Sequence, residues 1–329
     1  MQASIANSIR RLPKRNCETV KMRLTVFLIL IFFSACYRVE RPLNKNKRPI
    51  QTFLIKKNLS IRNAGLKIAY SLHKYKPLKR RFADSNWVLT FSDEFDSLDL
   101  KKWRPGQPWG EVHPDNLHQY YDATEVKTQN GYLYLGGAYK PKTFKVKDSL
   151  ITVPYAIGLI NSDISFKQKY GYFEIRSKNP SGAATWPAFW LTGANRWPPE
   201  IDIFEMYGQK TGKTVHAQYT TVHWGESGSK SRGYLCRKIN LPKNTDSSFH
   251  VYGCLWTPNS IRLYTDGKCV SHMRVNAKLR KWLDDEMVVI INNCFEAKYI
   301  KYLPQDFQRN EFVVDWVKVY TSKRPIDKI

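Results

Sequence analysis

The feature that most constrains this chain is a row of carboxylates within a segment of strand-forming residues, Glu200-Ile201-Asp202-Ile203-Phe204-Glu205. β-Branched and aromatic residues in this density favour a β-strand. In a strand, side chains at i and i+2 share a face, so Glu200 and Asp202 are expected to point the same way. Regular alternation would turn Glu205 to the other face. A one-residue bulge after Ile203 would return it, because β-bulges re-aim side chains near active sites.

Three like charges on one strand face repel one another, and this segment contains no Lys or Arg to pair with them. Retaining glycoside hydrolysis needs such a row: a nucleophilic carboxylate and a proton-donating carboxylic acid, about 5–5.5 Å apart. A third carboxylate between them can keep the donor's pKa raised. The alternative is a solvated polar strand face. Flanking tryptophans favour the sugar chemistry, since flat aromatic rings suit the apolar faces of sugars; these are Trp186 and Trp197, with Trp190 also a candidate core residue.

The segment E-I-D-I-F-E, preceded by W-P-A-F-W-L, resembles the signature of glycoside hydrolase family 16, in its bulged E-x-D-x-x-E branch. That family includes laminarinases, mixed-linkage glucanases, agarases, porphyranases and carrageenases. The resemblance implies that Glu200 is the nucleophile, Glu205 the general acid/base and Asp202 an assisting residue. It implies no cofactor for catalysis. It also implies a β-sandwich jelly roll of the concanavalin A-like lectin/glucanase type, with an open cleft on a concave sheet.

The rest of the chain supports an all-β domain. Strand patterns recur every 8–15 residues and no long helical period appears. The stretches 249–268 and 312–320 match scaffold strands of the family, and in some members the Asp equivalent to Asp315 helps to bind a structural calcium. Asn130-Gly131 is expected to form a hairpin-type turn, and residues 136–156 are expected to form a long loop. The resemblance covers about residues 84–322.

The resemblance also implies a set of sugar-binding residues. The strand Y-G-Y-F-E-I-R-S-K, residues 170–178, matches a family strand that lines the cleft beside the catalytic one, where Glu174 and Arg176 would contact sugar hydroxyls. A solvent-exposed strand face with cross-strand ion pairs is the alternative. His223 would donate to a substrate hydroxyl and Trp224 would stack on a sugar, although a structural histidine is also possible. Asn116, Trp186 and Trp197 complete the predicted set.

One departure bears on the substrate. Residues 116–121, N-L-H-Q-Y-Y, resemble the laminarinase stretch N-x-E-x-Q-Y-Y, but Leu117 and His118 stand where the sugar-binding Glu belongs. A missing polar contact changes selectivity strongly. We expect an endo-glycosidase acting on β-1,3-glucan or mixed-linkage glucan; the alternative is a marine galactan of the agar, porphyran or carrageenan type. A transglycosylase or a non-catalytic carbohydrate-binding surface protein on the same fold are the further alternatives.

The N-terminal part of the chain differs in charge from the rest. Residues 1–82 contain 20 Lys and Arg against 2 acidic residues, whereas residues 83–329 contain 33 against 26. Most of the net charge of +25 therefore belongs to the tail and is no nucleic-acid footprint of the domain. Residues 37–83 are expected to be a disordered basic tether, with a short helix around Ile61–Leu72.

Residues 1–36 are expected to be a signal region. Met22-Arg23 precedes an apolar run of about 12 residues, which suits a signal h-region and is too short to span a bilayer. Ser34-Ala35-Cys36 resembles a bacterial lipoprotein processing site, so the expected start is Met22 and the expected partner a membrane, reached through a lipid on Cys36. The protein would be a monomer at the outer membrane or cell surface. Ordinary secretion is the alternative.

Four cysteines remain in an oxidising compartment if Cys17 is untranslated and Cys36 lipidated: Cys236, Cys254, Cys269 and Cys294. Four allow three disulfide pairings, and buried free thiols are the alternative.

Overall fold

A computed structural model of the chain describes residues 86–113, 115–211, 217–226, 233–241 and 245–329, without the side chains of residues 233–237 and 328. The predictions for the signal region 1–36, the start at Met22, Cys36 and the basic tether lie outside the described residues. Within these ranges no helix is both long and apolar enough to cross a membrane.

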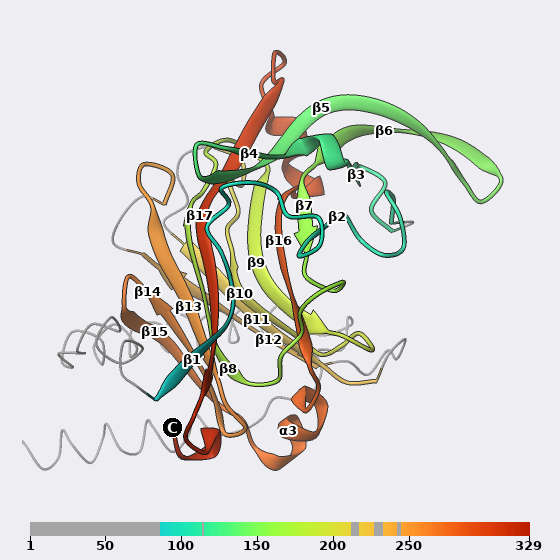
Figure 1. The fold of residues 1–329 in the computed structure, drawn as a ribbon. Helices are drawn as coiled ribbons and strands as arrows, with labels where there is room; N and C mark the ends of the chain where they lie inside the picture. Colours follow the sequence, from blue (N-terminus) through green and yellow to red (C-terminus); the bar gives the residue numbers. More distant parts are fainter. Residues whose placement is uncertain (1–85, 114, 212–216, 227–232, 242–244) are drawn as a thin grey trace, which may run out of the picture. The chain divides into compact units, whose positions relative to one another are not determined.

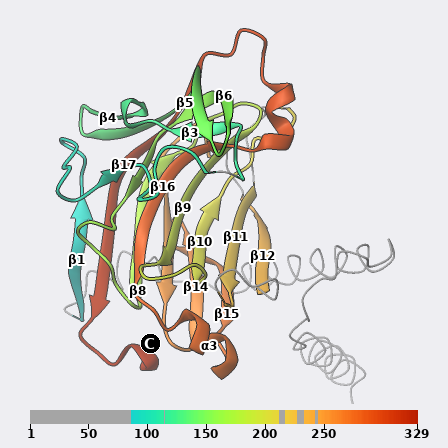
Figure 2. The same cartoon turned by 90° about the vertical axis from the view of Figure 1, so that its right-hand side faces the viewer.

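The described residues form two sheets packed face to face, with almost no helix, and the strands of both sheets pair antiparallel except β3 with β6. The predicted all-β jelly-roll sandwich is therefore confirmed (Figures 1 and 2). The ten-stranded sheet has the order β15-β14-β13-β8-β17-β5-β6-β3, with β1 on β17 and β4 on β5. The seven-stranded sheet has the order β12-β11-β10-β9-β16-β7-β2. Among the described residues, the α-helix α3 (Ala277–Leu283) precedes β16, and the short 3₁₀ helices are η2 (Ala123–Glu125), η3 (Ala297–Tyr302) and η4 (Ile326–Lys328).

The strands of the ten-stranded sheet are β1 (Trp87–Asp93), β3 (Gln119–Tyr121), β4 (Val126–Gln129), β5 (Tyr132–Val146), β6 (Ser149–Ile157), β8 (Gly171–Lys178), β13 (His250–Trp256), β14 (Ser260–Thr265), β15 (Lys268–Arg274) and β17 (Arg309–Ser322). Those of the seven-stranded sheet are β2 (Arg104–Pro105), β7 (Leu159–Asn161), β9 (Thr185–Gly193), β10 (Glu200–Glu205), β11 (Ala217–Trp224), β12 (Gly233–Asn240) and β16 (Met287–Phe295).

The main hydrophobic core lies between the two sheets, because each strand sends alternate side chains inward. Phe189, Ile201 and Phe204 of the seven-stranded sheet meet residues such as Phe173 and Tyr252 of the ten-stranded sheet, all fully buried. The opposite face of the seven-stranded sheet is therefore left to carry polar and aromatic side chains.

Residues 136–156 differ from the predicted long loop. They belong to β5 and β6, which pair in a hairpin that extends well beyond the sandwich (Figure 1). The segment is not a loop because its two halves pair with each other and so satisfy their backbone hydrogen bonds. The tight turn predicted at Asn130-Gly131 is confirmed: it joins β4 to β5, and both residues have positive φ, 53° and 73°.

Among the described side chains, Cys254, Cys269 and Cys294 are free thiols. These three cysteines form no disulfide, so the alternative prediction of free thiols is confirmed for them.

Candidate active site

The predicted bulge is present in β10. Asp202 pairs with Trp190 of β9 and Phe204 pairs with Phe189, so Ile203 is the additional residue. The register with β11 shifts in the same interval, between Asp202 and Glu205. Ile203 and Phe204 both enter the core, and the side chain of Glu205 returns to the outer face of the sheet. The bulge thus sets three carboxylates on one face of one strand.

Glu200 is held by two neighbouring rings. The indole Nε1 of Trp197 donates to Glu200 Oε2 at 2.7 Å, and His223 Nε2 lies 3.3 Å from Glu200 Oε1. Burial and, after it, the charge of Asp202 raise the pKa of Glu200 to about 8, while His223 and Trp197 oppose the shift. Trp197 is 41% exposed, so its ring remains open to a ligand above the carboxylate. Trp197 and His223, both predicted to contact sugar, thus lie beside Glu200, and their contact with sugar stays a prediction.

Glu205 accepts three hydrogen bonds. Trp186 Nε1 and the Tyr207 hydroxyl both donate to Oε1, at 3.0 and 2.7 Å, and the Thr221 hydroxyl donates to Oε2 at 3.0 Å. Burial and the adjacent Glu205 raise the pKa of Tyr207, so it remains a donor throughout the accessible pH range. These contacts fix the orientation of the Glu205 carboxyl group.

Asp202 lies between the two glutamates and is 5% exposed. Burial, and then the charge of Glu205, raise its pKa well above the usual range, while a hydrogen bond from Thr221 opposes the shift. His223 Nε2 is 3.6 Å from Asp202 Oδ2. Oxygens of Glu200 and Asp202 lie within 4.8 Å of each other, so burial and this proximity both favour the protonated form of these two carboxyl groups.

Three residues of this site were not predicted from the sequence: Tyr207, Thr221 and Asn292. Tyr207 follows the bulged strand directly. Thr221 is two residues before His223 and therefore shares its face, a period-2 signal that could have identified it. Asn292 of β16 accepts the indole N–H of Trp190 at 2.6 Å, which places Trp190 on the outer face of the sheet and not in the main core.

Glu174 and Arg176 do not lie beside the catalytic strand, so that prediction is wrong. Their strand, β8, belongs to the ten-stranded sheet, and both side chains point away from the core. The Glu174 carboxylate accepts hydrogen bonds from the hydroxyls of Tyr172 and Tyr320, and burial raises the pKa of Glu174 to about 7. Arg176 pairs with Asp315. Local alternation is the same in either sheet, so it could not tell which face meets the substrate.

Trp224 is also placed differently from the prediction. It packs against the main core, whereas His223 points to the outer face. Neighbouring residues of a regular strand point to opposite faces, so the two cannot both line the cleft.

Residues close to Asn116 in the sequence make contacts that hold the fold together. His118, near the position of the missing Glu, has its Nε2 2.9 Å from the carbonyl oxygen of Phe295, and Gln119 Oε1 accepts the backbone N–H of Phe295 at 2.8 Å. Asn116 itself is half-buried, and its contact with sugar stays a prediction.

Asp315 pairs with the Arg176 guanidinium. Calcium takes six to eight oxygen ligands, and no described cluster of acidic, His or Cys groups includes Asp315. The residues present do not fit a calcium ion at Asp315. The described group with ligand atoms within 4.8 Å of one another consists of Glu200, Asp202 and His223.

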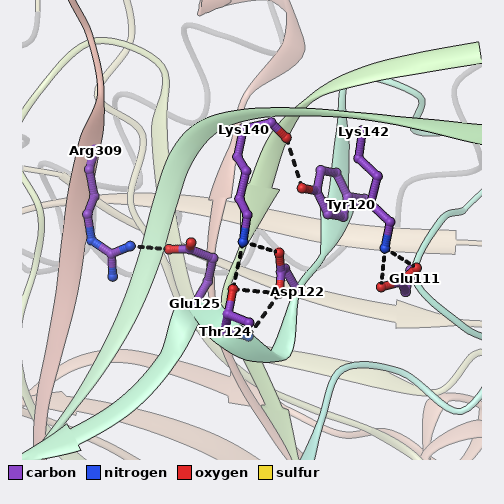
Figure 3. Close-up of polar contacts among 8 residues, drawn as sticks. All are labelled: Glu111, Tyr120, Asp122, Thr124, Glu125, Lys140, Lys142 and Arg309. Atoms are coloured by element: carbon purple, nitrogen blue, oxygen red, sulfur yellow. Dashed lines mark hydrogen bonds and ion pairs between the residues drawn. The ribbon is translucent and has the colours of Figure 1, made fainter.

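The base of the β5–β6 hairpin is fixed by ion pairs (Figure 3). Lys140 Nζ lies 2.8 Å from Asp122 Oδ2, and Lys142 Nζ lies 2.8 Å from Glu111 Oε2. Tyr120, packed among them, donates to the carbonyl oxygen of Lys140 at 2.8 Å. Because both lysines pair with carboxylates of the protein, they are less available to bind an anionic ligand.

Comparison with known families agrees with this geometry. Residues 86–322 match the family model described as the GH16 domain of β-porphyranases A–D. The chain belongs to glycoside hydrolase family 16.

Relatives and solved structures extend the comparison. Endo-1,3-1,4-β-glycanase ExsH of Rhizobium meliloti is 29% identical over 255 residues, which cover 70% of this chain and 51% of the relative. The chain thus spans about half the length of that protein. The β-glucanase of Rhodothermus marinus is 30% identical over 198 residues, 55% of this chain and 63% of the relative. The LamAcat structure from Zobellia galactanivorans aligns with a TM-score of 0.60 at 25% identity, covering 71% of this chain and 98% of that one.

Proposed function

We propose that this family 16 protein is a retaining endo-glycosidase that hydrolyses a β-linked polysaccharide, with β-1,3-glucan or mixed-linkage β-glucan as substrate. The observation that carries the proposal is the bulge at Ile203, which sets Glu200, Asp202 and Glu205 on one face of β10. Trp186 and Trp197 donate to the two outer carboxylates of this row, so aromatic rings flank the position of the reacting bond.

The residues divide the chemistry as follows. Glu200 attacks the anomeric carbon, the glycosidic C–O bond breaks, and Glu205 gives its proton to the leaving oxygen. Water then attacks the glycosyl-enzyme, Glu205 takes a proton from that water, and the bond to Glu200 breaks. The reactive form has Glu200 ionised and Glu205 protonated, and Asp202 lies between them as the assisting residue. The steps need no metal ion.

Two observations favour a neutral glucan. Curated relatives of this chain are named endo-1,3-1,4-β-glycanases and β-glucanase. In addition, Lys140 and Lys142 at the base of the β5–β6 hairpin are paired with carboxylates of the protein.

A galactan is the second candidate, for two reasons. The matching family model is described by β-porphyranases. The Glu that laminarinases carry in the N-x-E-x-Q-Y-Y stretch is absent here, and His118 contacts the main chain of Phe295 in that region. A relative from Sphingobacterium multivorum, 26% identical over 259 residues, is named a keratan-sulfate endo-1,4-β-galactosidase.

The first test is product release by the full chain from laminarin, lichenan, agarose, porphyran and κ-carrageenan, with Glu200→Gln as the comparison. We expect one polymer to be cleaved, with the β-anomer formed first, as NMR would show. Glu200→Gln is expected to lose at least about 10³-fold in kcat, because removal of a nucleophile costs several orders of magnitude.

The outcomes separate the candidates. Cleavage of laminarin or lichenan supports the first, and cleavage of a galactan alone supports the second. More than about one per cent residual activity in Glu200→Gln would remove the nucleophile role. Binding to a polymer without cleavage would favour a carbohydrate-binding protein, and products longer than the substrate would show a transglycosylase.

We also propose that the protein is anchored at the cell surface through a lipid on Cys36. The supporting observation is the sequence Ser34-Ala35-Cys36 after an apolar run. Labelled palmitate should enter the protein in a bacterial host and should not enter Cys36→Ala. Labelling that persists in Cys36→Ala would overturn the anchor.

A further inference from the structure

The loop of residues 194–199 joins β9 to β10 and carries Trp197. The indole of Trp197 donates to Glu200 Oε2 at 2.7 Å, and the centroid of its ring lies 6.2 Å from that of His223. Trp197 is 41% exposed and belongs to none of the buried hydrophobic clusters of the described residues. Core packing therefore contributes little to its position, and the backbone of the loop must determine where the indole points.

Arg196, the residue before Trp197, holds this backbone. Its Nη1 donates to the carbonyl oxygen of Pro198 at 3.0 Å, so the guanidinium group bridges from one side of Trp197 to the other. The loop also folds closely onto the end of β9. A Cβ atom at Gly193 would lie 2.4 Å from the carbonyl oxygen of Arg196, and the Gly193 N–H donates to the carbonyl oxygen of Pro199 at 2.9 Å.

The same guanidinium group anchors the loop to two other segments. Nη1 also donates to the carbonyl oxygen of Gly225, directly after β11, at 3.4 Å, and Nη2 donates to the carbonyl oxygen of Trp282 in α3 at 3.1 Å. Nε lies 3.6 Å from Asp285 Oδ2, in a side chain that is 14% exposed. The planar guanidinium group carries five N–H donors, which is why one side chain can serve several carbonyl oxygens at once.

These contacts converge on the nucleophile without touching it. Trp197 and His223 both lie against Glu200. Trp197 is on the loop that Arg196 holds, and His223 stands two residues before Gly225, which Arg196 also contacts. One guanidinium group thus fixes both segments that supply the ring partners of Glu200.

We propose that Arg196 is a positioning residue, which fixes the loop 194–199 and the end of β11 so that the Trp197 indole donates to the nucleophile and its exposed ring meets the sugar there. Arg196 acts through Trp197 and not by contact with the substrate. The inference rests on the proposed function in one respect, because only a glycosidase uses Glu200 as a nucleophile.

A double-mutant cycle tests this route. Arg196→Met keeps the aliphatic stem and removes every donor, and we expect kcat/KM on the preferred polymer to fall at least about tenfold, because misplacement at the reacting centre can cost about 10²-fold. Trp197→Phe keeps a ring and removes the indole N–H. In that background Arg196→Met should cost less than about threefold, since residues that act through one another are not additive. Equal losses in both backgrounds would overturn the proposal.

Arg280→Met is the matched control. Arg280 lies on α3, and its Nε donates to the carbonyl oxygen of Pro258 at 2.9 Å, in the turn between β13 and β14 of the ten-stranded sheet. The same chemical change there should lower the melting temperature and leave kcat/KM within about twofold of wild type. A tenfold loss in Arg280→Met as well would show that activity needs α3 to be anchored in general, and would overturn the assignment to Trp197.

A second measurement separates this inference from the proposed function. ¹H–¹⁵N spectra of the free protein, assigned with Trp197→Phe and Trp186→Phe, report the exchange of each indole N–H with water. Trp186 is the internal comparison, because its indole donates to Glu205 Oε1 at 3.0 Å. In Arg196→Met the Trp197 indole should exchange at least about fivefold faster, and the Trp186 indole as in wild type.

The outcomes are distinct. Faster exchange at Trp197 without cleavage of any polymer would sustain the positioning role and overturn the proposed function. Cleavage by wild type, with unchanged Trp197 exchange in Arg196→Met, would do the reverse.

Arg196→Lys carries the test if Arg196→Met does not fold. It keeps a positive charge for Asp285, but an ammonium group lacks the fork that reaches several carbonyl oxygens. We expect the same changes at smaller size, with kcat/KM lower by at least about threefold and faster exchange at Trp197. A folded Arg196→Lys variant with wild-type kcat/KM and wild-type indole exchange would overturn the proposal.

Discussion

Single residues around Glu205 show how a reactive carboxyl group is held in place. Its Oε1 accepts from an indole and a phenol, and its Oε2 from a hydroxyl. Hydrogen bonds to a charged group contribute about 1.5–3 kcal/mol each. Tyr207 is packed against Trp186 and, edge-on, against Tyr219, so its hydroxyl is directed at the carboxylate by its ring.

Tyr207→Phe tests this contact. The ring packing remains and one donor to Glu205 is lost, so we expect kcat on the preferred polymer to fall about tenfold or more, with little change in melting temperature. Tyr219→Phe is the matched control, since its hydroxyl meets Gln209 at 3.4 Å and no carboxylate. Equal kcat values for Tyr207→Phe and wild type would show that Trp186 and Thr221 suffice.

At the scale of elements, the bulge adds a residue to β10 and does not change the spacing of residues on the two neighbouring strands. The pairs on either side of Ile203 are consecutive on β9: Trp190 opposite Asp202, then Phe189 opposite Phe204. Asp202 and Glu205 face Thr221 and Tyr219, two residues apart on β11. Neither β9 nor β11 has an extra residue in this interval, so the extra residue belongs to β10 alone.

This register predicts the result of deleting Ile203. The shortened strand would alternate regularly, with Glu205 still opposite Tyr219 and still on the outer face. We expect the variant to fold and to retain activity well above that of Glu205→Gln. It should be less stable by about 2–5 kcal/mol, because a buried isoleucine is lost.

Ile203→Ala is the control for the deletion, because it loses nearly the same side chain and keeps the bulge. Circular dichroism, melting temperature and kcat/KM of both variants are the measurements. A folded deletion variant as inactive as Glu205→Gln would show that the bulge geometry itself is required.

At the scale of the whole molecule, the carboxylate row costs stability. Burial raises the pKa of Glu200 from 4.5 to about 8, so the folded protein keeps a proton that the unfolded chain releases above about pH 4.5. The stabilisation from that proton is complete at low pH and is lost as pH rises toward 8. The free energy of unfolding falls by up to about 1.4 kcal/mol per pH unit over this range. The raised pKa of Asp202 acts in the same direction.

Glu200→Gln is neutral at all pH values and escapes this loss. We expect its melting temperature, relative to wild type, to rise by at least about 3 °C between pH 5 and pH 8, since 1 kcal/mol corresponds to about 2–4 °C at this size. Asp148→Asn at the exposed β5–β6 turn should show no such trend. A constant difference for Glu200→Gln across the pH range would contradict the raised pKa.

Local signals in the sequence determined the fold class, the Asn130-Gly131 turn and the faces of β10. Period-2 alternation predicted that Glu200 and Asp202 share a face, because alternation depends only on backbone geometry within a few residues. The bulge that returns Glu205 to this face came from the chemistry of a carboxylate row and the resemblance to the bulged branch, and the structure has that bulge.

Only the tertiary structure decided which sheet each strand joins. β8 alternates as a cleft strand would, yet it pairs with β17 and β13 and turns Glu174 and Arg176 to the far side of the sandwich. The tertiary structure also decided the contacts of Tyr207 and Thr221 with Glu205. Thr221 reaches Glu205 because β11 pairs with β10, and Tyr207 reaches it through the path of the chain after β10. Alternation gives the two faces of a strand, but pairing between residues distant in sequence decides which face is covered by the core.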